Sequence, residues 1–372
     1  MSMTKTTDQT VLVAMSGGVD SSTALHKILE AGYQAIGVTM KLWEYRDSGG
    51  NLVADSNCCS ISSINNARLV CEQFGVPHYT LDHQPAFRRS VVNNFVDEYL
   101  AGRTPNPCVR CNTFLKWGSL LEQAREMGAD LIATGHYARI DNTADTPRLL
   151  KGRDPLKDQS YFLWGIDRAT LARTIFPLGD LTKTAVRTIA GEQNLPNADE
   201  PESQEICFIP DNDYRRFLND YAPERSAGSK AGNFIDENGK ILGTHRGIAG
   251  FTVGQRRGLG IAGPEPYYVR RINPATGDIT LATRAGVTFR SCRVGELNLL
   301  AGEAPHSWRE LTVQIRYNHP GVAAIVIPEK NSSLRIEFAE PQFAVAPGQS
   351  AVFYRGDQVL GGGIITEGIV DE

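Results

Sequence analysis

The feature that most constrains this 372-residue chain is a short apolar run that breaks into a serine-glycine-glycine turn and then enters a helical pattern. The apolar run is Val11–Ala14, and the turn is Ser16-Gly17-Gly18. Two adjacent glycines let the backbone approach an anion closely, and the first N–H groups of the following helix point at the same place. This strand, turn and helix predict a phosphate-binding site near the start of an α/β domain.

Polar residues in and after the turn strengthen this prediction. Ser16, Ser21 and Ser22 offer hydroxyl groups, and Asp20 offers a carboxylate suited to Mg²⁺. The pattern differs from the Walker loop, because no Lys-Ser or Lys-Thr follows the second glycine, and it also differs from Gly-x-Gly-x-x-Gly. The loop therefore belongs to neither of these common nucleotide-binding patterns.

Strand-like and helix-like segments alternate after the turn. The spacing of apolar residues predicts helices over 21–31, 61–74, 86–100 and 112–127 and strands over 35–40, 78–81 and 130–134. Such alternation predicts a parallel sheet with helices on both faces, in which ligands lie at the carboxyl ends of the strands. Ser16–Ser21, Met40 and Gly135-His136 are therefore expected along one rim of the sheet.

The character of the chain changes beyond residue 141. A helix is expected over 170–193 and a short amphipathic helix over 213–221, and glycine-punctuated β-rich segments follow from residue 228. We predict three parts: a nucleotide-binding catalytic domain over 1–220, a small central β-rich domain over 221–287 and a C-terminal β-barrel-like domain over 288–372. The fold class is α/β, with a parallel sheet followed by two small β-rich domains.

Composition narrows the class of protein. The net charge is -4, so overall electrostatics give no sign of a nucleic-acid partner. No apolar run approaches the length of a membrane span, and the polar start lacks a signal-peptide core, so we expect a cytoplasmic protein that does not use a membrane. Seven cysteines in such a chain argue against a disulfide framework and for metal or thiol chemistry at some positions.

The second informative stretch is Gly102–Asn112, which contains Cys108 and Cys111. Its two prolines and its glycine predict a stiff loop that runs into a helix beginning near residue 112. A thiolate at the entrance of that helix would be stabilised by the helix dipole and by the charge of Arg110. Cys111 is therefore a candidate nucleophile.

The third stretch is Glu202–Pro210, which surrounds Cys207. A cysteine between isoleucine and phenylalanine is most often buried, and apolar surroundings raise the pKa of a thiol, so this position alone favours a structural role. Cys71 lies on the apolar face of an expected helix and is predicted to be a core residue. The adjacent pair Cys58-Cys59 is more often incidental than metal-binding.

These three stretches resemble the tRNA-specific 2-thiouridylases, which are PP-loop ATP pyrophosphatases. Lys157–Phe162 and Phe251–Gly260 carry the same resemblance, which runs essentially from end to end of the chain. The resemblance implies an enzyme that thiolates the wobble uridine of tRNA with ATP and Mg²⁺. The uridine C2 oxygen is first joined to AMP and then replaced by sulfur, which suits an oxygen that leaves poorly as hydroxide.

The resemblance also implies the roles of individual residues. Cys207 receives sulfur as a persulfide from a sulfur-relay protein, and Cys111 frees it through a transient disulfide with Cys207. The residues implied in ATP binding are Ala14, Met15, Ser16, Gly17, Gly18, Val19, Asp20, Ser21, Met40 and Gly135. The residues implied in tRNA contact are Asn106, Pro107, Cys108, His136, Lys157, Asp158, Gln159, Arg316, Tyr317 and Gln349, of which the first three read the target base. A helical part at about 150–220 and the C-terminal domain are expected to bind tRNA, and a monomer is the expected state.

Cys108 departs from the family pattern, because many members carry aspartate at this position. Together with Cys111 and Cys207 it provides three thiolates, which suit a 4Fe-4S cluster whose fourth iron carries the sulfide. The persulfide route and the cluster route both stay open on the sequence.

Two other functions are compatible with parts of the sequence. A PP-loop ligase that adenylates a carboxylate would use the loop but not the three cysteines. A noncatalytic RNA-binding module would use the cysteines for structural zinc, although a closed zinc site normally has four ligands and the set has three unless Cys58 or Cys59 joins. Release of pyrophosphate that depends on tRNA separates the three functions.

Overall fold

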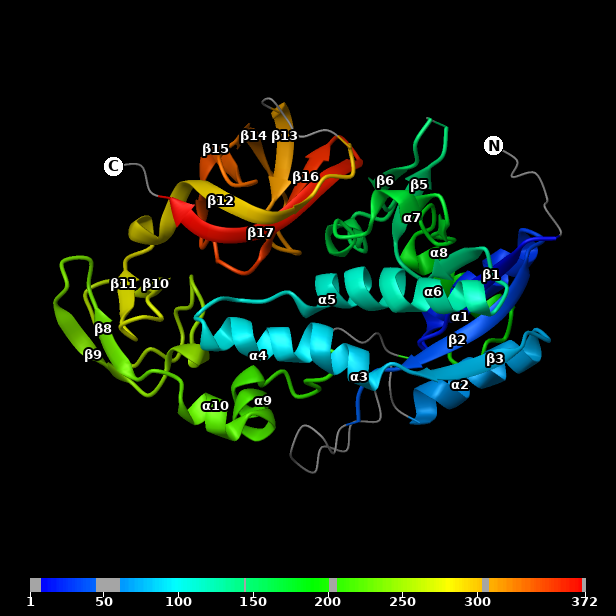
Figure 1. Cartoon of the computed structure of the whole chain (residues 1–372), viewed down its shortest axis with the longest axis horizontal. Coiled ribbons are helices and arrows are strands. Elements are labelled where there is room, and N and C mark those ends of the chain that lie inside the picture. The colour runs from blue at the N-terminus through cyan, green and yellow to red at the C-terminus, as the bar shows by residue number, and fades with distance from the viewer. Residues whose placement is uncertain (1–7, 45–60, 144, 201–205, 303–307, 370–372) are drawn as a thin grey trace. The chain divides into compact units, whose positions relative to one another are not determined.

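The computed structural model describes residues 8–44, 61–143, 145–200, 206–302 and 308–369 (Figure 1). The chain forms two compact units. The first comprises residues 1–90, 108–213 and 357–359, and the second comprises 91–107, 214–356 and 360–372. Among the helices of the described ranges, none combines the length and apolar character that crossing a bilayer requires.

The first unit is built on a five-stranded parallel sheet with the strand order β3-β2-β1-β4-β7. Its strands are β1 (Thr10–Ala14), β2 (Gln34–Lys41), β3 (His78–Asp82), β4 (Leu131–Thr134) and β7 (Thr174–Ile175). Val11, Leu12 and Val13 of the central strand are all fully buried, so both faces of that strand are covered. Figure 1 shows β1, β2 and β3 side by side in blue, and the predicted parallel sheet is confirmed.

The strand order indicates where this sheet binds a ligand. The chain runs outward from β1 to β2 and β3 and then returns to the other side of β1 with β4. Open α/β sheets bind their ligands at the carboxyl ends of strands, at the point where the strand order reverses. In this sheet that point lies at the ends of β1 and β4, at Ala14 and Thr134.

Three helices, α1 (Val19–Glu30), α2 (Ile61–Gln73) and α8 (Lys183–Glu192), share one buried apolar cluster with the central strand. The central strand contributes Val11 and Val13 to this cluster, with Met15 just beyond the strand. Cys71 of α2 also lies in the cluster, which confirms its predicted place in the core. Because α1 and α8 contact each other, residues from late in this unit lie beside the helix that follows the turn.

Two helical stretches each contain a π-helical segment. The first consists of α3 (Gln84–Phe87), η2 (Arg88–Val92) and α4 (Asn93–Leu100), and the second of α5 (Pro107–Arg110), η3 (Cys111–Ser119) and α6 (Leu120–Glu126). The predicted loop through residue 112 is wrong, because Pro107 occupies the first helical position, where the missing N–H of proline costs no hydrogen bond. Cys111 consequently opens the second π-helical segment, and such segments are frequent at functional sites.

The predicted helix over 170–193 is also wrong. The structure instead has α7 (Arg168–Leu171), followed by β7 and α8. Pro177 lacks the N–H that a continuous helix needs, and a Cβ atom at Gly179 would lie 2.0 Å from the Ala138 carbonyl oxygen. The prediction also lacks three short elements, β5 (Ala138–Asp141), β6 (Arg148–Lys151) and η4 (Ser160–Phe162). The β5–β6 hairpin pairs with Gln358, which belongs to the same unit.

The second unit holds a four-stranded sheet and a closed β-barrel. The sheet has the order β10-β11-β8-β9, and the barrel order β12-β15-β14-β13-β16-β17 is closed by pairing of β17 with β12. The strands are β8 (Gly232–Ile235), β9 (Ile241–His245), β10 (Tyr268–Ile272), β11 (Ile279–Ala282), β12 (Thr288–Asn298), β13 (Trp308–Gln314), β14 (Val322–Pro328), β15 (Leu334–Phe343), β16 (Ser350–Arg355) and β17 (Gln358–Ile369). The helical elements are α9 (Tyr214–Tyr221), α10 (Pro223–Ala227), η5 (Ile248–Gly250) and η6 (Ala285–Val287). The predicted fold class, a parallel sheet followed by β-rich parts, is confirmed.

The pH dependence of stability has a contribution from four histidines, His78, His83, His245 and His319. Burial lowers the pKa of each imidazole, because desolvation disfavours the charged ring. In the unfolded chain these imidazoles bind protons below about pH 6.5, whereas in the folded protein they bind protons only at lower pH. We therefore expect the free energy of unfolding, measured by urea denaturation, to fall as the pH is lowered from about 7.5 to about 5.5. An unfolding free energy that rises over this range would contradict the prediction.

Candidate active site

The turn after β1 forms a compact loop at the point where the strand order reverses. Gly17 has a φ of 81°, and a Cβ atom there would lie 2.1 Å from the Ser63 carbonyl oxygen, so a larger residue does not fit. At Gly135, just after β4, a Cβ atom would lie 2.8 Å from the backbone of Asp20. The turn after β1 therefore packs against α2, and the turn after β4 packs against the first turn of α1, each as closely as glycine permits.

The serine hydroxyl groups mainly shape this loop. Ser21 and Ser22 both donate to the Gly18 carbonyl oxygen, at 2.9 and 3.2 Å. The backbone N–H and the hydroxyl group of Ser16 both donate to Ser21 Oγ, each at 3.2 Å. Ser22 is fully buried, so the expectation that it offers a hydroxyl group to a ligand is wrong. Of the three serines, Ser16 is the exposed one.

Asn197 holds the loop from a distant part of the sequence. Its Nδ2 donates to the Gly17 carbonyl oxygen at 2.6 Å and to Ser22 Oγ at 2.9 Å, and its side chain is fully buried. These bonds tie the turn to the interior and leave the first N–H groups of α1 available for an anion. Sequence reasoning missed Asn197, because a single asparagine 180 positions away from the loop carries no local pattern.

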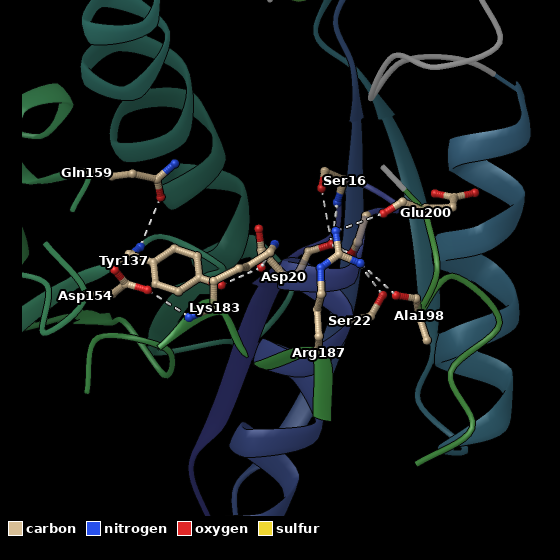
Figure 2. A network of polar contacts seen from close by, with 12 residues as sticks. Ser16, Asp20, Ser22, Tyr137, Asp154, Gln159, Lys183, Arg187, Ala198 and Glu200 are labelled. Carbon is tan, nitrogen blue, oxygen red and sulfur yellow. Dashed lines mark hydrogen bonds and ion pairs between the residues drawn. The ribbon is translucent and has the colours of Figure 1, made fainter. Parts of the chain in front are cut away.

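A partly buried ion pair lies at the first turn of α1. Lys183 Nζ donates to Asp20 Oδ1 at 2.7 Å, and the Tyr137 hydroxyl donates to the same oxygen at 2.7 Å (Figure 2). Asp20 Oδ2 takes part in neither contact. One carboxylate oxygen beside a phosphate loop fits Mg²⁺, which proteins commonly bind through one or two carboxylates together with substrate phosphates. The sequence predicted a role for Asp20 but missed Lys183 and Tyr137.

The other predicted ATP-binding residues differ in what they can offer. The side chains of Met15 and Val19 are 2% and 4% exposed and belong to the core of the sheet. A nucleotide at this loop can therefore contact these two residues through their backbone only. Met40 lies near the carboxyl end of β2 and is 9% exposed, and Ala14 ends β1 and is half-buried.

Solvent access separates the described cysteines into two groups. Cys71 and Cys292 are fully buried, and burial raises the pKa of both thiols, that of Cys71 to about 12. Cys108 is exposed, and Cys111 and Cys207 are half-buried. Because the thiolate is the reactive form and must be reached by its partner, the second group contains the candidates for thiol chemistry.

The observed helix start changes the electrostatic argument for the thiols. Because α5 begins at Pro107, Cys108 lies in the first helical turn and Cys111 in the second. The dipole of a helix acts mainly within its first turn, so it favours the thiolate of Cys108 more than that of Cys111. Arg110 donates to the Ser90 carbonyl oxygen at 2.8 Å, and its guanidinium also covers a neighbouring phenylalanine ring.

The segments of the two cysteines predicted to exchange sulfur attach to the same helical turn of the first unit. Phe208, which follows Cys207, is fully buried, and its ring centroid lies 5.6 Å from that of Phe87. Arg110, which precedes Cys111, donates a hydrogen bond to the carbonyl oxygen of Ser90. Phe87 and Ser90 are three positions apart across α3 and η2, or about 5 Å along a helix. Both cysteine segments are therefore anchored within one turn of each other.

Within the described ranges, no three side chains among His, Cys, Asp and Glu gather in an arrangement that could hold a metal ion. An iron–sulfur cluster and a closed zinc site both need ligands that converge on one point. As arranged in the described residues, Cys108, Cys111 and Cys207 therefore do not form a site for a single metal ion. Cys58-Cys59 lies outside the described residues.

Two of the predicted tRNA-contacting residues are engaged in hydrogen bonds to backbone groups of the first unit. Asp158 Oδ1 accepts hydrogen bonds from the N–H groups of Gly152 and Ser160, at 2.9 and 3.1 Å. Burial raises the pKa of Asp158 against the opposing effect of these bonds. Gln159 Oε1 accepts the N–H of Tyr137 at 3.0 Å (Figure 2). Asp158 and Gln159 thus fix the shape of the loop that carries the predicted contact Lys157.

His136 lies between Thr134 and Lys116. Its Nδ1 is 2.6 Å from Thr134 Oγ1, and its Nε2 is 3.4 Å from Lys116 Nζ. Burial, with the added charge of Lys116, holds the pKa of His136 well below its usual range. Because an ammonium group can only donate, a neutral imidazole would accept at Nε2 and carry its proton on Nδ1.

In the second unit, Gln349 binds the segment that precedes Asn106 and Pro107. Its Nε2 donates to the carbonyl oxygens of Thr104 and Pro105, each at 3.1 Å. Three predicted tRNA contacts that are far apart in sequence are therefore close together in this unit. The remaining two follow β13 and are Arg316, which is exposed, and Tyr317, which is half-buried.

A parallel sheet with a glycine loop where its strand order reverses defines a nucleotide-binding α/β domain. The family model of the tRNA methyl transferase HUP domain matches residues 9–211 of the chain. The models of the tRNA methyl transferase PRC-barrel domain and of the aminomethyltransferase beta-barrel domain match residues 215–283 and 289–365.

Curated relatives match nearly the whole chain. The tRNA-specific 2-thiouridylase MnmA of Geotalea uraniireducens (strain Rf4) is 45% identical over 361 residues, which cover 96% of this chain and 95% of that protein. The tRNA-specific 2-thiouridylase MnmA of Salinibacter ruber (strain DSM 13855 / M31) is 46% identical over 365 residues, covering 96% and 94%. The chain belongs to the tRNA-specific 2-thiouridylase family, as its motifs predicted.

The loop geometry predicts the effect of Gly17→Ala on ATP affinity. The new methyl group would overlap the Ser63 carbonyl oxygen, so the loop must move and lose contacts with phosphate. Each lost hydrogen bond to a charged group weakens binding about 10- to 100-fold, and calorimetric titration measures this loss. Gly75→Ala is the control, because Gly75 also has a positive φ, of 66°, but a Cβ atom there meets nothing within 4 Å. Equal ATP affinities in the two variants would contradict the prediction.

Proposed function

We propose that this chain is an ATP-dependent sulfurtransferase that converts the wobble uridine of tRNA to 2-thiouridine. The observation that carries the proposal is that the first unit combines a glycine phosphate loop with two accessible cysteines anchored to one helical turn. The family supports it, because its curated relatives are named tRNA-specific 2-thiouridylases.

The loop serves the activation of the uridine. The uridine C2 oxygen attacks the α-phosphate of ATP, the bond to the β-phosphate breaks, and pyrophosphate leaves. The N–H groups of the first turn of α1 bind phosphate oxygens, and Asp20 Oδ2 is the oxygen offered to Mg²⁺. Mg²⁺, when bound, offsets the negative charge of the phosphates. Activation turns the C2 oxygen into part of a good leaving group, AMP.

The cysteines serve the delivery of sulfur. Cys207 accepts sulfane sulfur from a sulfur-relay protein and carries it as a persulfide. The Cys111 thiolate attacks Cys207 Sγ, the persulfide bond breaks, and hydrosulfide leaves with the bonding electrons while a Cys111–Cys207 disulfide forms. Hydrosulfide adds to C2 of the activated uridine, and AMP leaves with the electrons of the C2–O bond. An external thiol then reduces the disulfide and restores both cysteines.

The predicted tRNA contacts extend this proposal over both units. Lys157 and His136 contact tRNA from the first unit, and Asn106, Pro107 and Cys108 read the target base. Arg316, Tyr317 and Gln349 contact tRNA in the C-terminal domain. We retain the division into domains over 1–220, 221–287 and 288–372, with tRNA bound by the part at about 150–220 and by the last domain. The enzyme acts as a monomer in the cytoplasm, where its tRNA substrate is found.

Serine variants of the two cysteines test the sulfur step. Cys111→Ser and Cys207→Ser are each expected to abolish 2-thiouridine, measured by nucleoside mass spectrometry, because a hydroxyl group neither carries sulfane sulfur nor opens a persulfide. Pyrophosphate release that depends on tRNA should persist in both, because activation does not use the thiols. Cys292→Ala, at a buried thiol of the second unit, is the control and should retain activity. Full thiolation by either serine variant contradicts the assignment.

The same pyrophosphate measurement tests the two other functions. A ligase for a carboxylate substrate would release pyrophosphate without tRNA. A noncatalytic RNA-binding module would release none under any condition. Either result for the unmodified protein would reject the proposed function.

The alternative 4Fe-4S cluster on Cys108, Cys111 and Cys207 is tested by metal analysis. Because the three thiols do not converge as a metal site in the described residues, we expect protein purified without oxygen to thiolate tRNA while free of iron and acid-labile sulfide. The measurement compares iron content, sulfide content and thiolation in the same preparation. Thiolation that requires bound iron, and that is lost together with the iron in Cys108→Ala, would contradict the persulfide route.

A further inference from the structure

The phosphate loop of this chain carries a carboxylate where many phosphate loops carry a cation. Asp20 is the second residue of α1, and the sequence from Ser16 to Ser22 contains no lysine or arginine. A Walker loop, in contrast, provides a lysine that reaches the phosphates. Since a carboxylate repels the triphosphate, this loop requires a positive charge from another element.

The structure brings such a charge to the loop from α8. Lys183 is the first residue of that helix, and its ammonium lies 2.7 Å from Asp20 Oδ1. The position of its backbone is fixed, because its N–H donates to Asp154 Oδ2 at 2.9 Å (Figure 2). Thr182 also caps the helix, since its hydroxyl oxygen accepts the N–H of Ala185. The Lys183 side chain is 11% exposed, so it is held inside the site rather than extended into solvent.

The neighbouring groups keep this ammonium beside the loop. The Tyr137 hydroxyl shares Asp20 Oδ1 with Lys183, and the Tyr137 ring centroid lies 5.9 Å from Lys183 Nζ. Arg187, one turn further along α8, donates instead to the carbonyl oxygens of Ala198 and Glu200 (Figure 2). Lys183 is thus the cation that α8 directs at the phosphate loop.

We propose that Lys183 is a phosphate-contacting residue of the ATP site, which supplies from α8 the cation that the loop itself lacks. An ammonium group has three N–H donors, so it can contact Asp20 and a phosphate oxygen together. During activation, negative charge accumulates on the departing pyrophosphate, and a cation held at this place stabilises it. This inference rests on the proposed function, because it requires ATP at the loop.

A purely structural role for Lys183 is the competing explanation. In that case the lysine would only neutralise Asp20 and keep the loop folded. Loss of the lysine would then weaken the binding of every ligand of the site to a similar extent. If Lys183 contacts phosphate, its loss lowers the affinity for ATP and leaves the affinity for adenosine, which has no phosphate, unchanged.

The test compares Lys183→Met, Lys183→Arg and the control Lys27→Met, whose lysine pairs with Glu30 on the solvent side of α1. In Lys183→Met we expect ATP affinity to fall about 10- to 100-fold, with adenosine affinity unchanged and tRNA-dependent pyrophosphate release strongly reduced. Lys183→Arg retains the charge and should recover part of the ATP affinity. Lys27→Met should match the unmodified protein in every measurement.

Three results would overturn the inference. They are unchanged ATP affinity in Lys183→Met, an equal loss of ATP and adenosine affinity, and no recovery in a folded Lys183→Arg. If Lys183→Met does not fold, amine labelling of the unmodified protein decides, because ATP should protect Lys183 and adenosine should not. Failure of the unmodified protein to bind ATP would instead reject the proposed function, so the two failures are distinguishable.

Discussion

The site depends on a steric constraint at the turn after β1. With no side chain at Gly17 or Gly135, the turn packs against α2, and the end of β4 packs against the start of α1. The Asn197 amide then binds the Gly17 carbonyl oxygen and fixes the turn. This packing leaves the first N–H groups of α1 to an anion and places Asp20 beside them. The connection between β1 and α1, which has room for glycine but not for a side chain, thus forms the phosphate-binding part of the nucleotide site.

Local pattern was enough to predict the sheet and the loop but not the residues that complete the site. Val11–Ala14 and the glycines after it form a contiguous signal, so the strand, turn and helix could be read directly. Asn197 and Lys183 reach the loop only because α1 and α8 pack together, and no sequence pattern links positions so far apart. Pro107 was misread because proline usually breaks a helix, although it is well suited to begin one.

The solvent exposure of the thiols also could not be predicted from their neighbours in the sequence. Apolar neighbours favoured a buried Cys207, yet Phe208 packs against Phe87 and leaves the cysteine beside it half-buried. Anchoring the segments of Cys207 and Cys111 to one helical turn suits an exchange between two sulfur atoms, because one thiol has to reach one partner. A cluster has a stricter requirement, since three thiols must point to one centre together. The arrangement thus favours transfer through a persulfide.

Pairing Lys183 with Asp20 resolves an electrostatic difficulty of this site. The proposed activation uses a carboxylate for Mg²⁺ and a cation for phosphate, but each charge alone is costly to hold in a partly buried place. In the structure the two charges neutralise each other at 2.7 Å. In the proposed activation, Mg²⁺ would give Asp20 a further partner of opposite charge, and a phosphate oxygen would do the same for Lys183. The ion pair therefore holds both groups in place and leaves neither of these two charges without a partner of opposite sign.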